Sequence, residues 1–175
     1  LAILAAGQLY VIVSGGFDLS VGSLITLVVI GSSMLLNNNP DATWWVIGVM
    51  YTIGLGVGLI NGLVVSILRV PSLIATLGMM ITLSGLAMMW SGGAPRGYLT
   101  DSFRYFGRNN ILDVPIISIL PVSLIVLAAV GGLLYWLMHR TNLGSMIHAI
   151  GDNPRAANLA GVPVARIRIT AFVVS

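Results

Sequence analysis

Long hydrophobic runs and short polar interruptions alternate along this chain, and the runs have the length of membrane helices. A helix that crosses a bilayer needs about 20 predominantly apolar residues. The pattern predicts helices over Val21 to Leu36, Trp44 to Leu68, Ser72 to about Trp90, and Ile116 to Met138. Residues 1–14 and 169–175 are apolar but too short to cross alone, so we interpret the chain as an internal fragment of a longer protein.

Composition agrees with this pattern and narrows the class of protein. Hydrophobic residues make up 57% of the 175 residues and charged residues only 7%, against about 25% charged residues in soluble domains. The mean hydropathy is +1.01. Such a chain lacks the charged shell of a soluble domain. The sequence therefore predicts an integral membrane protein of the all-α class, a polytopic helix bundle forming one transmembrane domain over residues 1–175.

Several chemistries are excluded by what the sequence lacks. It has no cysteine, which excludes disulfides and thiolate metal sites. It has no lysine, so it carries no Walker phosphate-binding loop. His139 and His148 have no acidic partner at ligand spacing. We predict no catalytic residue, no metal, no cofactor in this chain and no nucleic-acid partner.

Arginines set the expected orientation. Segment 139–168 contains four arginines and one aspartate, whereas segment 91–114 contains three arginines and two aspartates. Positive residues favour the cytoplasmic side. We therefore expect 139–168 to be a cytoplasmic loop and 91–114 to be extracytoplasmic.

Small residues recur within the second predicted span. Gly54, Gly58 and Gly62 are four residues apart and so lie on one helix face. Such a ridge lets another helix approach closely, which predicts helix packing at these glycines.

Three polar residues belong to the apolar part of the chain. Asn61 is expected to hydrogen-bond a neighbouring helix, with lining of a polar path as the alternative. Asp18 or Ser20 is expected to satisfy the free N–H groups at the start of the helix that begins at Val21, with a solute or ion contact as the alternative. All three are therefore candidates for the translocation path.

Residues typical of helix ends mark the start and the end of a short helix inside segment 139–168. Asn153 suits the N-cap, Pro154 the first helical position and Gly161 the C′ position, which predicts a helix over 154–160. A helix this short needs a docking surface. One side carries small apolar residues and the other carries Arg155, which favours a protein partner over lipid, because alanine buries little area. The apolar side consists of Ala156, Ala157, Leu159 and Ala160.

Four blocks of sequence, taken in order, resemble a known family. They are Gly15-Gly-Phe-Asp-Leu-Ser-Val-Gly22; Asn61-Gly-Leu-Val-Val with Arg69-Val-Pro71; Ile74-Ala-Thr-Leu-Gly78; and Thr141-Asn-Leu-Gly144 with Ala149-Ile-Gly-Asp-Asn-Pro-Arg-Ala-Ala157 and Gly161-Val. The chain is similar to permease subunits of ribose-type ATP-binding-cassette importers, within the group that includes branched-chain amino acid permeases. One departure is Ser145, where the family often has a basic residue.

The resemblance implies a fold and a set of partners. The fold would be that of the vitamin B12-type (type II) importers, from about the second to the seventh helix. Residues 144–163 would contain the coupling helix, with Gly151, Asn153, Pro154 and Arg155 among its contacts to a cytoplasmic ATPase that holds ATP and Mg. Arg104 and Arg108 would face an extracytoplasmic sugar-binding protein, with ordinary solvation of the loop as the alternative for each arginine alone.

The same resemblance implies a dimer and a location. A second permease copy would complete the path for a monosaccharide in the bacterial plasma membrane. The alternatives are a permease for branched-chain amino acids, an ion- or proton-coupled transporter or channel that needs no ATPase, and a structural scaffold.

Overall fold

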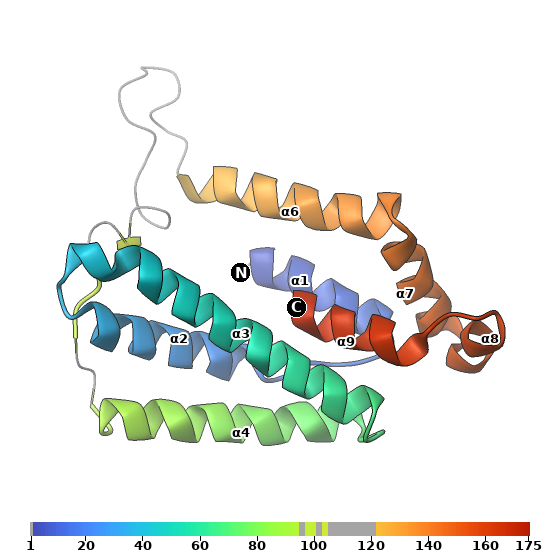
Figure 1. The fold of residues 1–175 in the computed structure, drawn as a ribbon, viewed down its shortest axis with the longest axis horizontal. Helices are drawn as coiled ribbons and strands as arrows, with labels where there is room; N and C mark the ends of the chain where they lie inside the picture. The colour runs from blue at the N-terminus through green and yellow to red at the C-terminus, as the bar shows by residue number, and fades with distance from the viewer. Residues whose placement is uncertain (1, 95–96, 101–102, 105–121) are drawn as a thin grey trace, which may run out of the picture.

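The chain is almost entirely helical in the computed structural model, which describes residues 2–94, 97–100, 103–104 and 122–175 (Figure 1). The described part contains α-helices, one short 3-10 helix and no strand, so the all-α prediction is confirmed. The elements are α1 (Ala2–Val13), α2 (Val21–Leu36), η1 (Pro40–Ala42), α3 (Thr43–Ser66), α4 (Ser72–Ser91), α6 (Val122–Arg140), α7 (Asn142–Asp152), α8 (Pro154–Leu159) and α9 (Val164–Val174).

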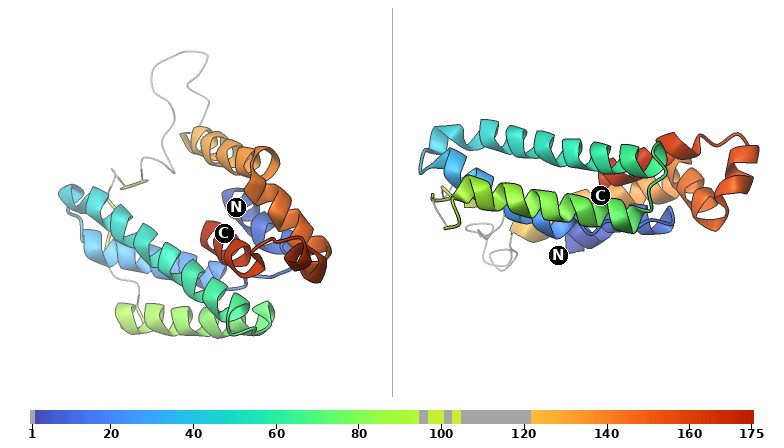
Figure 2. Two further views of the ribbon diagram at one scale, coloured as in Figure 1. Left: turned by 45° about the vertical axis from the view of Figure 1, so that its right-hand side comes forward. Right: turned by 90° about the horizontal axis from the view of Figure 1, so that it is seen from below.

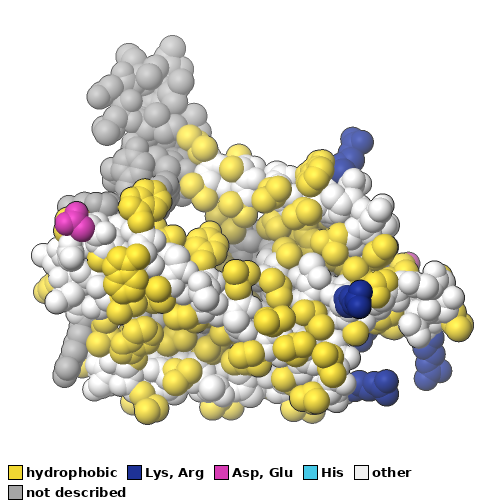
Figure 3. Space-filling model, viewed as in Figure 1, with side chains coloured by type: hydrophobic (Ala, Val, Ile, Leu, Met, Phe, Trp, Pro, Cys, Tyr) yellow, Lys and Arg dark blue, Asp and Glu magenta, His cyan; other side chains and the backbone are white. Residues whose placement is uncertain are grey.

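Within the described ranges, three helical stretches are long and apolar enough to cross a membrane. They are Pro40–Ser66, Ser72–Ser91 and Ser123–Arg140. Large apolar side chains cover their outer faces, and Trp44, Met89 and Ile81 are 73%, 81% and 68% exposed. Exposed apolar surface on this scale suits contact with lipid rather than water, and Figure 3 shows it spread over the face in view.

The helices form two groups that meet along α9. Helix α2 packs against α4 and α3, whereas α9 packs against α3, α1 and α7 (Figures 1 and 2). One buried cluster, containing Leu27, Val57 and Leu83, holds the first group together. Another holds α1, α6, α7, α8 and α9 together, with Tyr10, Met138, Ile147, Ile150, Ala157, Ile167 and Ala171 at its centre. The contact between α3 and α9 joins the two groups.

Two of the three ridge glycines lie in this α3–α9 contact. A Cβ atom placed on Gly58 would be 2.5 Å from the carbonyl oxygen of Phe172, and one on Gly62 would be 2.8 Å from the Cα of Ile169. Only glycine allows the two backbones to approach this closely. Gly54 has nothing within 4 Å of such an atom among the described residues, so the close packing involves Gly58 and Gly62 alone.

The α1–α2 connection is held by the first residue of α4. Helix α4 begins at Ser72, as predicted. The Oγ of Ser72 accepts a hydrogen bond from the backbone N–H of Phe17 at 3.1 Å. The extended segment before α2 is therefore tied to the start of α4.

Helix α7 was not predicted, although its sequence contains the signal. Leu143, Met146, Ile147 and Ile150 recur at the spacing of one helix face. That face packs into the cluster around Tyr10 and Met138. Segment 139–168 is thus two helices and the start of a third, and no extended loop is present.

Candidate functional site

Helix α8 begins with the predicted cap. The side-chain oxygen of Asn153 accepts hydrogen bonds from the backbone N–H groups of Arg155 and Ala156, both at 3.0 Å. Pro154 occupies the first helical position, where a backbone donor is not needed. Two of the otherwise unpaired N–H groups at the helix start are therefore satisfied by one side chain.

The end of α8 is equally well defined. Gly161 has φ +85°, and its N–H donates to the carbonyl of Asn158 at 3.0 Å. The N–H of Val162 donates to the carbonyl of Ala157 at 3.0 Å. This pair of bonds is the Schellman motif, which requires a left-handed residue at the position of Gly161. The helix ends at Leu159, one residue before the predicted end.

The two faces of α8 differ from the sequence interpretation. Ala157 is only 5% exposed and lies in the cluster with Ile147 and Ile167, so it packs inside this chain. The expectation that Ala157 contacts a partner is therefore corrected, because the short helix must bury one side to stay folded. Leu159 is 89% exposed, and Arg155 and Ala156 are exposed with it.

Gly151 anchors the preceding helix instead of presenting a side chain to a partner. A Cβ atom at this position would lie 2.0 Å from the carbonyl oxygen of Val13. The end of α7 thus contacts the end of α1 through backbone, which fixes where α8 begins. This role of Gly151 was not foreseen from the sequence.

Replacing Asn153 tests the cap directly. Asn153→Ala removes both capping bonds, and loss of an N-cap costs about 1 kcal/mol. We expect the amides of residues 155–160 to exchange hydrogen roughly fivefold faster, while the melting temperature of the whole protein changes little. Asn158→Ala is the matched control, because Asn158 lies on the same helix and is exposed. Equal exchange rates in the two variants would show that the cap contributes nothing.

The three candidate path residues form one hydrogen-bonded chain. The Nδ2 group of Asn61 donates to Ser20 Oγ at 2.9 Å, and Ser20 Oγ donates to Asp18 Oδ1 at 2.6 Å. The same Asp18 oxygen accepts from the Ser20 backbone N–H at 2.8 Å. Asn61 and Ser20 are each 1% exposed. The predicted bond from Asn61 to a neighbouring helix is therefore present.

Of the two residues that could satisfy a backbone N–H at the start of α2, Asp18 is the one that does so. Asp18 satisfies a backbone N–H at the start of α2, whereas Ser20 occupies the N-cap position without a capping bond from its hydroxyl. The hydroxyl is instead used between Asn61 and Asp18. A buried polar group needs a partner, and this bridge supplies partners on both sides of Ser20.

An apolar cavity of about 440 Å³ adjoins this polar chain. Asp18 and Ser20 line it at one end, and the rest of its wall comes mainly from apolar side chains of α2, α3 and the end of α9. The second oxygen of Asp18 has no hydrogen-bond partner among the described residues. The cavity therefore offers a carboxylate acceptor in a mainly apolar wall, to which Ser20, Tyr51 and Ser175 add hydroxyl groups; a mainly apolar wall with a few polar groups is the usual make-up of a small-molecule site.

Most of the basic side chains in view lie toward one end of the molecule. In Figure 3 this is the end formed by α7 and α8, and the most prominent acidic side chain lies at the opposite end. Arg104 is exposed, and Arg108 lies outside the described residues. The backbone N–H of Arg104 donates to the carbonyl of Thr100 at 3.1 Å, and this bond does not test the predicted contact with a partner, so the role of both residues stays a prediction.

Comparison with known proteins places the whole chain in one family. Residues 1–175 match the family described as branched-chain amino acid transport system / permease component. The ribose import permease protein RbsC of Escherichia coli (strain K12) is 34% identical over 175 residues, which are 98% of this chain and 52% of that protein. The L-arabinose transport system permease protein AraH of the same strain is 34% identical over 98% of this chain and 50% of its own length.

A third relative is named for a different solute. The autoinducer 2 import system permease protein LsrC of Klebsiella pneumoniae (subsp. pneumoniae, strain ATCC 700721 / MGH 78578) is 34% identical over 100% of this chain and 49% of its own length. The chain thus spans about half the length of the curated relatives it matches. No solved structure matches it significantly.

Proposed function

The chain belongs to the family of branched-chain amino acid transport system permease components, and from this premise we propose that it is part of the membrane subunit of an ATP-binding-cassette importer. The solute is a monosaccharide or a similar small polar molecule. Ribose, arabinose and autoinducer 2 are the solutes in the names of the relatives. The names of these relatives also favour an importer over a secondary transporter or channel.

One structural observation carries the coupling part of this proposal. Helix α8 is capped at both ends and fixed to the body through Ala157, yet Leu159 projects from it with 89% of its surface exposed. A large exposed apolar side chain on a fixed short helix suits a protein groove. We place the ATPase contact on Leu159 and Ala156, with Arg155 at its edge.

In this proposal, a movement of the ATPase is transmitted to the membrane helices through α8 and drives transport. ATP and Mg are held by the partner ATPase, and closure of two ATPase domains moves α8. Because Gly151 touches Val13 and Ala157 packs against α7 and α9, that motion reaches α1 and α9. Helix α9 packs on α3 at Gly58 and Gly62, beside Asn61 and Ser20. The coupling helix and the polar chain are thus joined by continuous packing.

The cavity beside Asp18 is the proposed solute contact. A carboxylate accepts hydrogen bonds from hydroxyl groups, and Asp18 has acceptor capacity left after its bonds to Ser20. An uncharged polyol suits such a wall better than a branched-chain amino acid, whose carboxylate would meet Asp18. A second permease copy, a sugar-binding protein facing residues 91–114 and a location in the bacterial plasma membrane complete the proposal.

Co-purification of the full-length protein with its ATPase tests the coupling surface. Ala156→Asp with Leu159→Asp places two charges on the exposed face of α8, so we expect at least a tenfold loss of bound ATPase. Arg140→Gln with Asn142→Asp is the matched control, because it makes the same change in net charge on exposed residues of the same segment. It should retain the ATPase.

Two results would contradict the proposal at different points. Equal ATPase recovery with both double variants would show that α8 is not the contact. If the unmodified protein bound no ATPase and transported solute in proteoliposomes with an ion gradient alone, the secondary-transporter alternative would hold.

A further inference from the structure

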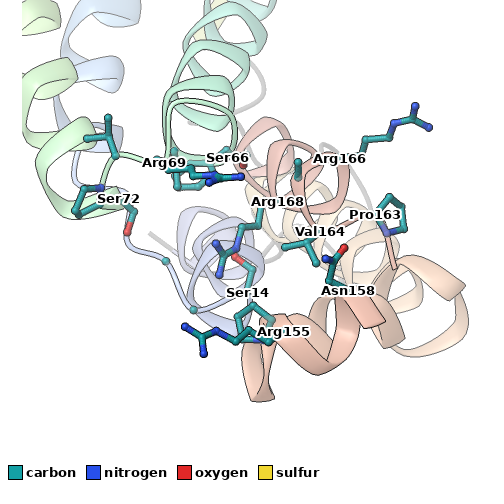
Figure 4. A pocket seen from close by; sticks show the side chains of 18 residues that line it. Ser14, Ser66, Arg69, Ser72, Arg155, Asn158, Pro163, Val164, Arg166 and Arg168 are labelled. Carbon is teal, nitrogen blue, oxygen red and sulfur yellow. The ribbon is translucent and has the colours of Figure 1, made fainter. Parts of the chain in front are cut away.

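A second, larger cavity lies between α8 and the body of the protein and is lined by arginines. Its volume is about 860 Å³. Its wall comes from the α1–α2 break, the α3–α4 turn, α8 and the first turns of α9 (Figure 4). Arg69, Arg155, Arg166 and Arg168 line it, and no acidic residue is among its described lining residues.

Three of these arginines share one opening. In Figure 4 the side chains of Arg69, Arg155 and Arg168 extend into the same region, whereas Arg166 points away from it. Within the described part of the chain, none of the three guanidinium groups has an ion pair or a hydrogen bond. Like charges that converge without a counter-ion repel one another, and a bound anion would remove this cost.

Arg69 indicates where the cavity lies relative to the membrane. This residue lies between the ends of two membrane-length stretches, Pro40–Ser66 and Ser72–Ser91. Its backbone has φ +58°, a left-handed conformation that is uncommon outside glycine. The tight turn therefore holds Arg69 next to the ends of two helices that are long enough to cross a membrane, which would place it near the lipid headgroups.

Neutral donors complete the wall of the cavity. The hydroxyl of Ser72 accepts from the N–H of Phe17 and keeps its own hydrogen for donation. The Oγ atom of Ser66 is buried and has no partner among the described residues. Both serines line the cavity with the arginines. The guanidinium groups of arginine and the hydroxyl groups of serine can both donate hydrogen bonds to the oxygens of a phosphate group.

We propose that this cavity binds the phosphate of an anionic phospholipid headgroup and so ties α8 to the membrane-embedded helices. Pro154, Arg155 and Asn158 line the cavity, but Leu159 and Ala156 do not. One side of α8 can therefore hold the lipid while the other contacts the ATPase. Arg155 lies at the edge of both surfaces, but Arg69 and Arg168 line the cavity and lie outside the docking face, so changing these two residues tests the site without altering the ATPase contact. Basic pockets at the cytoplasmic ends of membrane helices bind such headgroups in other proteins.

Native mass spectrometry on the full-length protein in detergent tests this site with phosphatidylglycerol as the probe and phosphatidylcholine as the neutral reference. Each arginine near an anionic headgroup contributes roughly fivefold in affinity. We expect Arg69→Gln with Arg168→Gln to weaken phosphatidylglycerol binding about 25-fold and to leave phosphatidylcholine unchanged. Arg69→Lys with Arg168→Lys keeps the charge and should fall between the two. Arg140→Gln removes one exposed charge outside the cavity, and this control should change binding less than about threefold, below the roughly fivefold expected for each cavity arginine.

The outcomes separate the sources of the anion. If millimolar inorganic phosphate displaces phosphatidylglycerol completely, the site takes free phosphate and the lipid assignment is wrong. If the cavity variants lose the ATPase but keep the lipid, the arginines meet acidic side chains of the partner. Equal losses with Arg140→Gln and the cavity variants would show only general charge attraction. Variants that retain their elution volume and helical circular dichroism are folded, so a lost lipid signal in them reports on the site.

Discussion

Gly58→Ala combined with Gly62→Ala is expected to push α9 away from α3 and to cause the largest loss of stability of any change considered for this protein. Each added methyl group would meet backbone: the carbonyl oxygen of Phe172 at 2.5 Å for Gly58, and the Cα of Ile169 at 2.8 Å for Gly62. Backbone cannot rotate aside as a flexible side chain can. Overpacking of this kind costs about 1–3 kcal/mol at each position.

The loss should exceed the local effect because α9 joins the two helix groups. Separating α9 from α3 also disturbs the neighbouring bond between Asn61 and Ser20. We expect the double variant of the full-length protein to melt at a clearly lower temperature in detergent, with less protein recovered in the folded peak of gel filtration.

Gly54→Ala is the control for this prediction, since it makes the same change on the same helix with nothing within 4 Å among the described residues. Alanine favours a helix over glycine by about 1 kcal/mol, so this variant should melt at the same temperature or slightly higher. If Gly58→Ala and Gly62→Ala also left the melting temperature unchanged, the close α3–α9 contact would be wrong.

Ser20→Ala is expected to be the second most damaging change, because it leaves the buried amide of Asn61 without its partner. A buried polar group that loses its partner costs about 1–3 kcal/mol. Asn61→Leu removes the amide itself. The double variant should therefore lose less stability than the sum of the two single variants, with a coupling of about 1 kcal/mol, the upper part of the range for bonds between membrane helices.

The pair Ser23 and Ser84 provides an internal comparison. Their hydroxyl groups are 2.9 Å apart between α2 and α4, at an exposed position. Ser23→Ala with Ser84→Ala should show a coupling below about 0.5 kcal/mol, since the freed groups do not remain buried. Additive losses for Ser20→Ala and Asn61→Leu would mean that the two side chains do not interact.

Transport measurements provide a second test of the hydrogen-bonded residues Asn61, Ser20 and Asp18. Ser20→Ala frees Asp18 Oδ1 from one of its two bonds. If the carboxylate contacts the solute, Ser20→Ala should alter transport at temperatures where the variant is still fully folded. Unchanged transport under those conditions would leave the polar chain with a structural role alone.

Local features were predictable from the sequence because their causes are local. The cap at Asn153, the proline at the first helical position and the left-handed Gly161 need only a few neighbouring residues. The apolar runs fixed the three membrane-length stretches for the same reason, since length and composition decide them. Helix α7 was missed although its apolar residues have helical spacing, because the segment was interpreted through its charges.

Partnerships between distant residues were decided only by the tertiary structure. Ala157 and Leu159 are both apolar and two residues apart, and packing against α7 and α9 buries one while it exposes the other. Either Asp18 or Ser20 was expected to cap α2, but the hydroxyl of Ser20 instead accepts a hydrogen bond from Asn61, 41 residues away. Arg69 reaches the cavity beside Arg155 and Arg168 only because a turn and two helix ends meet there. The sequence determined where helices begin and end, since those signals act within one or two turns. Which face of each helix is buried depends on the shape of its neighbours, and only the folded chain contains that information.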